Sequence, residues 1–300
     1  MNLMTLSTQP HQFNYIKLCF LELCCCFMAA CTDDNQLPDT PDEPGTSSFP
    51  YPTTQHRRIE LKEDMRGDAQ TVTNTKQFLF TEGRIERCIT TQSFYVVEPM
   101  VMSDTTHVVY QDNQAVISDA FGNTMTYQLD DNGYATSCTC KSGEKITRSY
   151  TFTYYTDEDN VVYLSSIIER LKDNDIYSSL TFDYSDYPNM LINHKVDEYE
   201  QSFMASTSTE NAIENRAEIP CPFIAELHPL AMHQVALYGK LLGEPYPLLV
   251  TDLKPTTTNA SNEKVNYQYT LNSKKFVTNC IQITSSYGNT HKREISYNFN

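Results

Sequence analysis

The chain has 300 residues, a formal net charge of −16, and 20 Tyr and 14 Phe but no Trp. This charge argues against nucleic acid as a partner, because nucleic-acid affinity comes from Lys and Arg that neutralise phosphates. It also argues against attachment to anionic lipid through a basic face. A composition rich in Tyr and Thr and poor in Gly favours strands over helices.

The first 30 residues predict a secretory signal peptide. Lys17 precedes a short apolar run that ends in small residues, and the run is shorter than the roughly 20 residues of a membrane-spanning helix. Its end, Met28-Ala29-Ala30-Cys31, resembles a bacterial lipobox, in which signal peptidase II cleaves before the cysteine and the cysteine is lipidated. We therefore predict lipidation of Cys31 and a membrane partner reached through this anchor.

Residues 31–57 are rich in Pro, Asp, Ser and Thr and predict a disordered acidic tether. Asp33 and Asp34, just after the cysteine, resemble the surface-export signal of Bacteroidetes lipoproteins. This resemblance implies display at the cell surface on the outer membrane, with the periplasmic face as the alternative.

Residues 58–300 predict a single antiparallel β domain. An aromatic strand, a polar turn and an aliphatic strand recur at uneven spacing, which does not fit the fixed period of a propeller or solenoid. The pattern predicts a meander of hairpins that forms a curved sheet or a barrel-like domain. In the clearest hairpin, Asn132-Gly133 predicts a tight type I′ turn. The hairpins are Thr75–Thr90, His107–Asp119, Tyr127–Ser137, Tyr150–Ile168, Leu180–His194 and Asn266–Ser285, with a closing strand at Arg293–Phe299.

The hairpin pattern breaks at residues 209–247. Within this insertion, Glu226–Leu242 has helical periodicity, and Pro229 suits a first helical turn. Gly243 and Pro245 end the pattern. We predict one amphipathic helix that packs on a face or an end of the sheet.

The YxxDxxGYxT hairpin of Tyr127–Thr136, the YTDEDN hairpin that follows it and the lipobox together resemble a family of β-rich Bacteroidetes lipoproteins of unknown function (DUF4595). This family is described as having a porin-like fold. The resemblance implies a barrel-like or strongly curved sheet over about residues 58–300. It brings no catalytic residues, and we do not expect the strands to insert into a membrane.

Acidic turns and cysteines are the candidate metal ligands. The turns at residues 130–132, 157–160 and 173–175 offer oxygens to Ca²⁺, but Asx-rich turns are expected for conformational reasons alone. Cys138 and Cys140 share a strand face and form half of a thiolate site. We predict no metal or other cofactor, at most one disulfide, and burial of the remaining thiols among Cys88, Cys138, Cys140, Cys221 and Cys280.

No catalytic constellation is evident. His228 and His233 are five residues apart, which is poor spacing for one helical ligand site, and the common nucleophile and nucleotide motifs do not occur. An enzyme is the less favoured interpretation. If there were one, a deep pocket would join His228 or His233 to a carboxylate.

Tyrosines are the candidate ligand-binding residues, because their rings stack on sugars or apolar groups and their hydroxyls add hydrogen bonds. The candidates are Tyr155, Tyr163, Tyr184 and Tyr187, with His228 and His233 on the predicted helix. We expect a cell-envelope lipoprotein with a non-catalytic binding or scaffolding role at the outer membrane, for a glycan or another nutrient ligand. The alternatives are a secreted hydrolase with its site at the barrel mouth or helical insertion, and a purely structural envelope protein.

Overall fold

The structure is a computed structural model that describes residues 56–66, 71–95, 98–207, 212–227, 231–257, 263–286 and 288–299. The predicted signal peptide, Cys31, and the predicted tether as far as residue 55 lie outside these residues. His56 and Arg57 already belong to the first strand. No helix in the described part of the chain is long and apolar enough to cross a membrane.

Sixteen antiparallel strands form a closed barrel in which each strand pairs with its neighbours in sequence and β1 pairs with β16. The predicted meander is confirmed, and it closes instead of ending as a curved sheet. The strands are β1 (His56–Arg66), β2 (Thr71–Thr81), β3 (Arg84–Tyr95), β4 (Pro99–Gln111), β5 (Gln114–Ser118), β6 (Asn123–Leu129), β7 (Ala135–Ser142), β8 (Lys145–Thr156), β9 (Val162–Leu171), β10 (Ile176–Asp183), β11 (Met190–Val196), β12 (Tyr199–Ser206), β13 (Asp252–Pro255), β14 (Lys264–Leu271), β15 (Val277–Ser286) and β16 (Asn289–Phe299).

Side chains alternate between the inside and the outside of the wall, as the period of two in a strand requires. On β8, Tyr150 and Phe152 are buried inside, whereas Thr151 and Thr153 are exposed outside. On β14, Tyr267 is buried and its neighbour Gln268 is exposed. The wall is thus apolar inside and polar outside. This is the reverse of an outer-membrane barrel, whose lipid-facing side chains are apolar.

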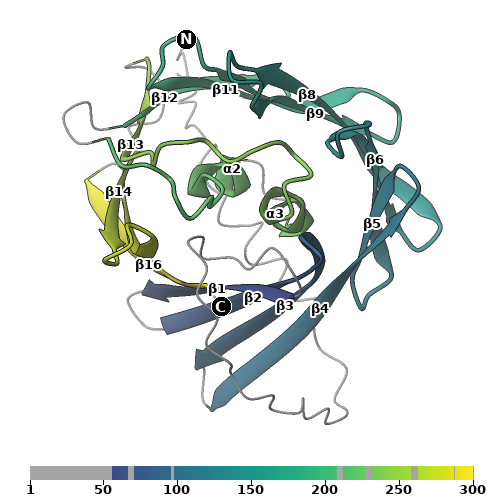
Figure 1. Cartoon of the computed structure of the whole chain (residues 1–300), viewed down its shortest axis with the longest axis horizontal. Helices are drawn as coiled ribbons and strands as arrows, with labels where there is room; N and C mark the ends of the chain where they lie inside the picture. Colours follow the sequence, from purple (N-terminus) through teal and green to yellow (C-terminus); the bar gives the residue numbers. More distant parts are fainter. Residues whose placement is uncertain are drawn as a thin grey trace, which may run out of the picture. The chain divides into compact units, whose positions relative to one another are not determined.

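The segment between β12 and β13 turns into the barrel and fills it. Figure 1 shows its two helices, α2 (Pro222–Leu227) and α3 (Ala231–Tyr238), inside the ring of strands. We call residues 212–227 and 231–251 the plug. The barrel end at which the chain leaves β12 for the plug is the plug end, and the opposite end is the distal end.

The prediction of one amphipathic helix over Glu226–Leu242 is wrong in number and in extent. Two short helices form instead, the first starts at Pro222, and α3 ends at Tyr238. Both lie inside the barrel, on the inner face of the sheet. Proline at the first position suits the start of α2 at Pro222, before the predicted start at Glu226. Since Val235, Ala236 and Leu237 are all buried, α3 has apolar neighbours on most sides and needs no polar face.

Backbone hydrogen bonds join the plug to the wall at the plug end. The amide of Ala135 donates to the carbonyl of Leu241 at 2.7 Å, and the amide of Glu244 donates to Val162 at 2.7 Å. Between these contacts, Gly243 has a φ of +89°, and a Cβ there would lie 3.0 Å from backbone atoms of β9. A glycine is therefore required where the plug passes over this strand.

The interior changes from apolar to polar toward the distal end, beyond the plug. The inward side chains of Glu63, Glu169, Ser178, Gln201 and Gln282 are buried there. Their carboxylates are paired, since Arg293 contacts Glu63 at 2.6 Å and Arg148 forms a salt bridge with Glu169. The distal half of the wall thus carries paired charges and polar groups, as buried polar groups require.

Candidate functional site

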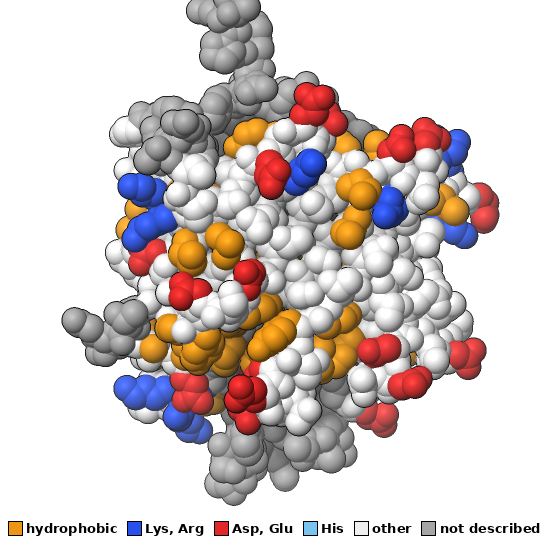
Figure 2. Space-filling view, turned by 90° about the horizontal axis from the view of Figure 1, so that it is seen from above, with side chains coloured by type: hydrophobic (Ala, Val, Ile, Leu, Met, Phe, Trp, Pro, Cys, Tyr) orange, Lys and Arg blue, Asp and Glu red, His pale blue; other side chains and the backbone are white. Residues whose placement is uncertain are grey.

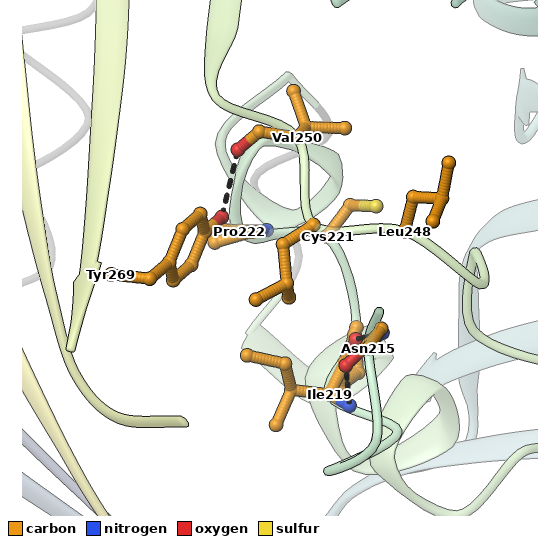
Figure 3. A pocket seen from close by; sticks show the side chains of 9 residues that line it. Asn215, Ile219, Cys221, Pro222, Leu248, Val250 and Tyr269 are labelled. Carbon is orange, nitrogen blue, oxygen red and sulfur yellow. Dashed lines mark hydrogen bonds between the residues drawn. The ribbon is translucent and has the colours of Figure 1, made fainter. Parts of the chain in front are cut away.

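The barrel interior offers no space of ligand size at its two best-defined hollows. The first lies between the plug and β14, where the hydroxyl of Tyr269 donates to the carbonyl of Val250 at 2.9 Å (Figure 3). It has a cavity volume of about 0 Å³. The second, bordered by Tyr184 and Tyr246, has about 30 Å³. A site for a small organic ligand usually needs about 300 Å³ or more, so binding at these hollows is excluded by size.

His233 is a packing residue of the plug. Its Nδ1 atom lies 2.7 Å from the hydroxyl of Tyr127, and its ring meets the ring of Tyr150 edge-on at 4.7 Å. Only 3% of the residue is exposed. The structure therefore places His233 in an aromatic core and away from any ligand surface. His228 lies outside the described residues.

The five cysteines of the barrel are all buried and unpaired by disulfides, and they pack as small apolar side chains. Burial raises the pKa of the Cys88 thiol to about 11 and that of Cys221 to about 12. Cys138, which shares a strand face with Cys140, also has a pKa raised by burial. No cluster of three or more His, Cys, Asp or Glu with metal-binding geometry occurs among the described residues. Protonated thiols are weak nucleophiles and poor metal ligands.

In two of the three predicted acidic turns, at residues 130–132 and 157–160, an aspartate side chain binds the backbone, as the conformational interpretation predicted. In the turn after β6, Oδ1 of Asp130 accepts hydrogen bonds from the amides of Asn132 and Tyr134, both at 2.9 Å. The residue three positions after the acceptor, Gly133, has a positive φ. Asp119, Asp157 and Asn272 repeat this arrangement, followed at the same offset by Gly122, Asn160 and Lys275.

This recurrent turn also corrects the predicted type I′ hairpin. A type I′ turn requires a positive φ at both central residues. Only Gly133 has one, at 89°, and Asn132 does not.

The four predicted tyrosines come together at the plug end. Tyr155 of β8 stacks on Tyr184, which follows β10, with ring centroids 5.6 Å apart. Tyr184 also meets Tyr163 of β9 at 5.6 Å. Tyr246 of the plug stacks on Tyr184 at 5.9 Å and meets Tyr187 edge-on at 6.3 Å. We call these five residues the tyrosine platform.

The platform has a fixed inner part and an exposed outer part. The hydroxyls of Tyr184 and Tyr246 donate to the carbonyls of Leu164 and Pro188 at 2.7 and 3.0 Å. By contrast, 44% of Tyr155 and 62% of Tyr187 are exposed. Ring faces and hydroxyls are thus presented to solvent on an anchored base, which suits stacking on a ligand.

Carboxylates border the platform. Figure 2 looks onto the side of the barrel at the top of Figure 1, where β8, β9, β11 and β12 lie, and it shows a group of hydrophobic side chains with acidic side chains nearby. Burial and the neighbouring carboxylate of Asp157 raise the pKa of Tyr163 to about 12. In the plug, Glu244 is paired with Lys240 at 2.7 Å, and Lys240 also contacts Glu218 at 2.8 Å.

Tyr246 was missed by the sequence analysis. It lies in the Pro-rich flank of the insertion, between Pro245 and Pro247, where no strand periodicity points to it. An aromatic residue held between two prolines, in the one segment that leaves the hairpin pattern, was the available signal. Tyr184 already joins the two hairpins, and Tyr246 adds the ring that links Tyr184 to Tyr187 within the turn after β10.

The class of the protein is that of a closed antiparallel barrel of porin-like shape, filled by its own chain. A family model described as a domain of unknown function (DUF4595) with porin-like fold matches residues 78–279. The chain belongs to this family, which confirms the resemblance seen in its hairpins.

Two solved structures are similar to the chain. A porin-like protein from Bacteroides uniformis is 39% identical, with a TM-score of 0.76, over 85% of this chain and 100% of that one. A porin-like protein from Bacteroides vulgatus is 11% identical, with a TM-score of 0.45, over 80% of this chain and 97% of that one. No curated protein matches the chain.

Proposed function

We propose that the protein is a lipid-anchored binding protein of the cell envelope without catalytic activity. The lipidated Cys31 holds it at the outer membrane, facing the cell surface, and the tyrosine platform binds a ligand taken from a glycan or another nutrient. The observation that carries this proposal is the gathering of five tyrosines from two hairpins and the plug on one surface, with Tyr155 and Tyr187 exposed. Because the interior is filled, a site on the surface is favoured, and a channel or a deep pocket is not.

Thermal unfolding in the presence of glycans and small nutrients tests the binding role, because a ligand of the native state raises the melting temperature by mass action. The expected result is a ligand-dependent rise that is lost when Tyr155→Ala and Tyr187→Ala are combined. Tyr199→Ala is the matched control, since Tyr199 is 50% exposed but lies at the distal end. A rise that survives the double substitution would place the site elsewhere.

The anchor is tested separately from the ligand. Mass spectrometry of the mature protein from its native host is expected to show a diacylated or triacylated N-terminal Cys31, and Cys31→Ala is expected to leave the signal peptide uncleaved. Proteinase accessibility on intact cells distinguishes the two leaflets. Protection of the barrel on intact cells but not on lysed cells would assign it to the periplasmic face.

A purely structural envelope role is the second candidate, favoured by the solid packing around the plug. It predicts that no soluble ligand shifts the melting temperature and that the platform substitutions leave every envelope phenotype unchanged.

A further inference from the structure

The tyrosine platform has a shape and a charge that together restrict its ligand. This inference rests on the proposed binding role and names the class of ligand that the same surface takes. The exposed rings of Tyr155 and Tyr187 are separated along the surface by Tyr184 and Tyr246, with successive centroids about 6 Å apart. A ligand that contacts both exposed rings has to pass across the two rings between them, which suits an extended segment.

The charge around the platform is one-sided. The turn after β8 carries Asp157, Glu158 and Asp159, and the turn after β10 carries Asp186. From the plug, Glu244 is neutralised by Lys240, which contacts Glu218 as well. The chain as a whole has a net charge of −16. Negative potential at the surface attracts cations, raises their association rate and repels anions.

Aromatic rings and carboxylates favour the same kind of ligand. A Lys or Arg side chain over a tyrosine face gains about 0.5–2 kcal/mol from the ring, and the carboxylates add attraction that a neutral sugar does not experience. The described part of the barrel already contains such contacts, since Arg84 lies over Tyr110 at 5.1 Å and Arg148 over Tyr177 at 5.2 Å. Oδ1 of Asp157 accepts two backbone hydrogen bonds in its turn.

We propose that the tyrosine platform binds an extended peptide segment that carries Lys or Arg. The cationic side chains lie over the exposed faces of Tyr155 and Tyr187, and the carboxylates of the two turns hold them there by charge. A neutral glycan is the competing occupant of the same surface.

The test is a titration of the mature protein with a short peptide of alternating Lys and Gly, a matched peptide with Gln in place of Lys, and neutral oligosaccharides. Because the chain has no Trp, tyrosine fluorescence reports binding directly, and calorimetry provides a second readout. The Lys peptide is expected to bind and the Gln peptide is not. Affinity is expected to fall between about 0.05 and 0.5 M salt, as screening predicts.

Two variants assign the binding to the platform. Tyr187→Ala is expected to lower the affinity for the Lys peptide by about two- to thirty-fold, which is the equivalent of one cation–ring contact. The double variant Asp157→Asn, Asp186→Asn is expected to lower the affinity for the Lys peptide more strongly at low salt, and to make that affinity less dependent on salt. Asparagine keeps the side-chain acceptor that Asp157 uses in its turn, so the fold is retained. Tyr199→Ala and Asp197→Asn are the distal-end controls.

The outcomes separate the two proposals. Binding of neutral oligosaccharides without binding of the Lys peptide overturns the cationic ligand and leaves the binding role intact. Binding of the Lys peptide that both platform variants leave unchanged overturns the assignment to this surface. Absence of binding by peptides, glycans and nutrients overturns both proposals and favours the structural role.

Discussion

The wide interior of the barrel is occupied differently at its two ends. At the plug end, the wall is apolar and the chain supplies its own filling, with Phe223 fully buried. At the distal end, the wall turns polar and its carboxylates are paired with arginines of the same wall. A barrel of sixteen strands is wider than wall side chains alone fill. The difference therefore shows that the reach of the plug decides where the interior is apolar.

The rims differ in the same sense. The plug end presents stacked tyrosines among carboxylates, whereas the distal rim exposes separate apolar side chains such as Phe121 (56%) and Ile176 (56%). Among the described residues, the plug end carries the group of tyrosine rings in mutual contact, from two hairpins and the plug. Part of this surface depends on the plug, because Tyr246 supplies the ring between Tyr184 and Tyr187.

The largest effect on stability is expected from truncating a buried side chain of the plug. Phe223→Ala removes a fully buried ring of α2 and should lower the free energy of unfolding by about 3–5 kcal/mol, through lost transfer energy and the cavity that remains. Urea unfolding measures this difference. Phe121→Ala makes the same substitution at an exposed distal turn and should change stability by less than about 0.5 kcal/mol. Equal losses for the two variants would contradict the view that the plug stabilises the barrel.

The distal end is expected to respond less strongly, through its polar contacts. Glu169→Gln removes the charge that pairs with Arg148 and disturbs the hydrogen bonds from Tyr150 and Ser178, at 3.1 and 2.6 Å. We expect a loss of about 1–3 kcal/mol, because the remaining buried groups stay partly unsatisfied. Glu158→Gln, at an exposed turn, is the matched control. A neutral or stabilising result would mean that hydration at this end replaces the lost contacts.

The sequence predicted the wall and failed on the filling, for a physical reason. Alternation on β8 and β14 follows a local rule, with each strand apolar on one face, so it is visible in a few residues. The plug obeys no local rule. Helix α3 is buried on most sides, and its neighbours are wall residues distant in sequence, such as Ile85 and Tyr150. Its periodicity was therefore read as one longer helix lying against the sheet.

The candidate site shows the same division between local and non-local information. The tyrosines on or beside strands, such as Tyr155 and Tyr184, were predicted because tyrosine rings stack on ligands and their hydroxyls form hydrogen bonds. Their gathering depends on neighbouring hairpins ending at one rim and on Tyr246 from a distant segment. His233 was chosen for its chemistry, but the inward course of the plug buries it.

The recurrent turn occurs at both ends of the barrel, so its contribution to stability can be compared between them. Asp130 lies at the plug end and Asp119 at the distal end, and each accepts two backbone amide hydrogen bonds. Asp130→Ala and Asp119→Ala should each cost about 1–2 kcal/mol, at about 1 kcal/mol for a hydrogen bond. Asp131→Ala, beside the first, is the control and should be nearly neutral. Thermal unfolding of the three variants measures this, and an equal effect of Asp131→Ala would rule out the turn as the cause.

The smallest effect on stability is expected from ionisation of the buried thiols. Their reactivity reports whether the packing around them is closed. Burial raises the pKa of Cys88 to about 11 and that of Cys221 to about 12, against about 8.5 in an unfolded chain. Their contribution to stability is therefore complete below about pH 8.5, and it is lost as the pH rises from there toward the folded-state pKa values. Alkylation of the native protein at about pH 8, read residue by residue by mass spectrometry, should leave both thiols unmodified.

The Phe223→Ala variant turns these thiols into a local probe. Cys221 belongs to the plug, two residues before Phe223, whereas Cys88 belongs to β3. If the plug can loosen while the wall stays closed, alkylation of Cys221 should become faster in the variant and Cys88 should remain protected, because local openings need less free energy than unfolding. Equal acceleration at both positions would show that plug and wall unfold together, and that the filling and the barrel are one cooperative unit.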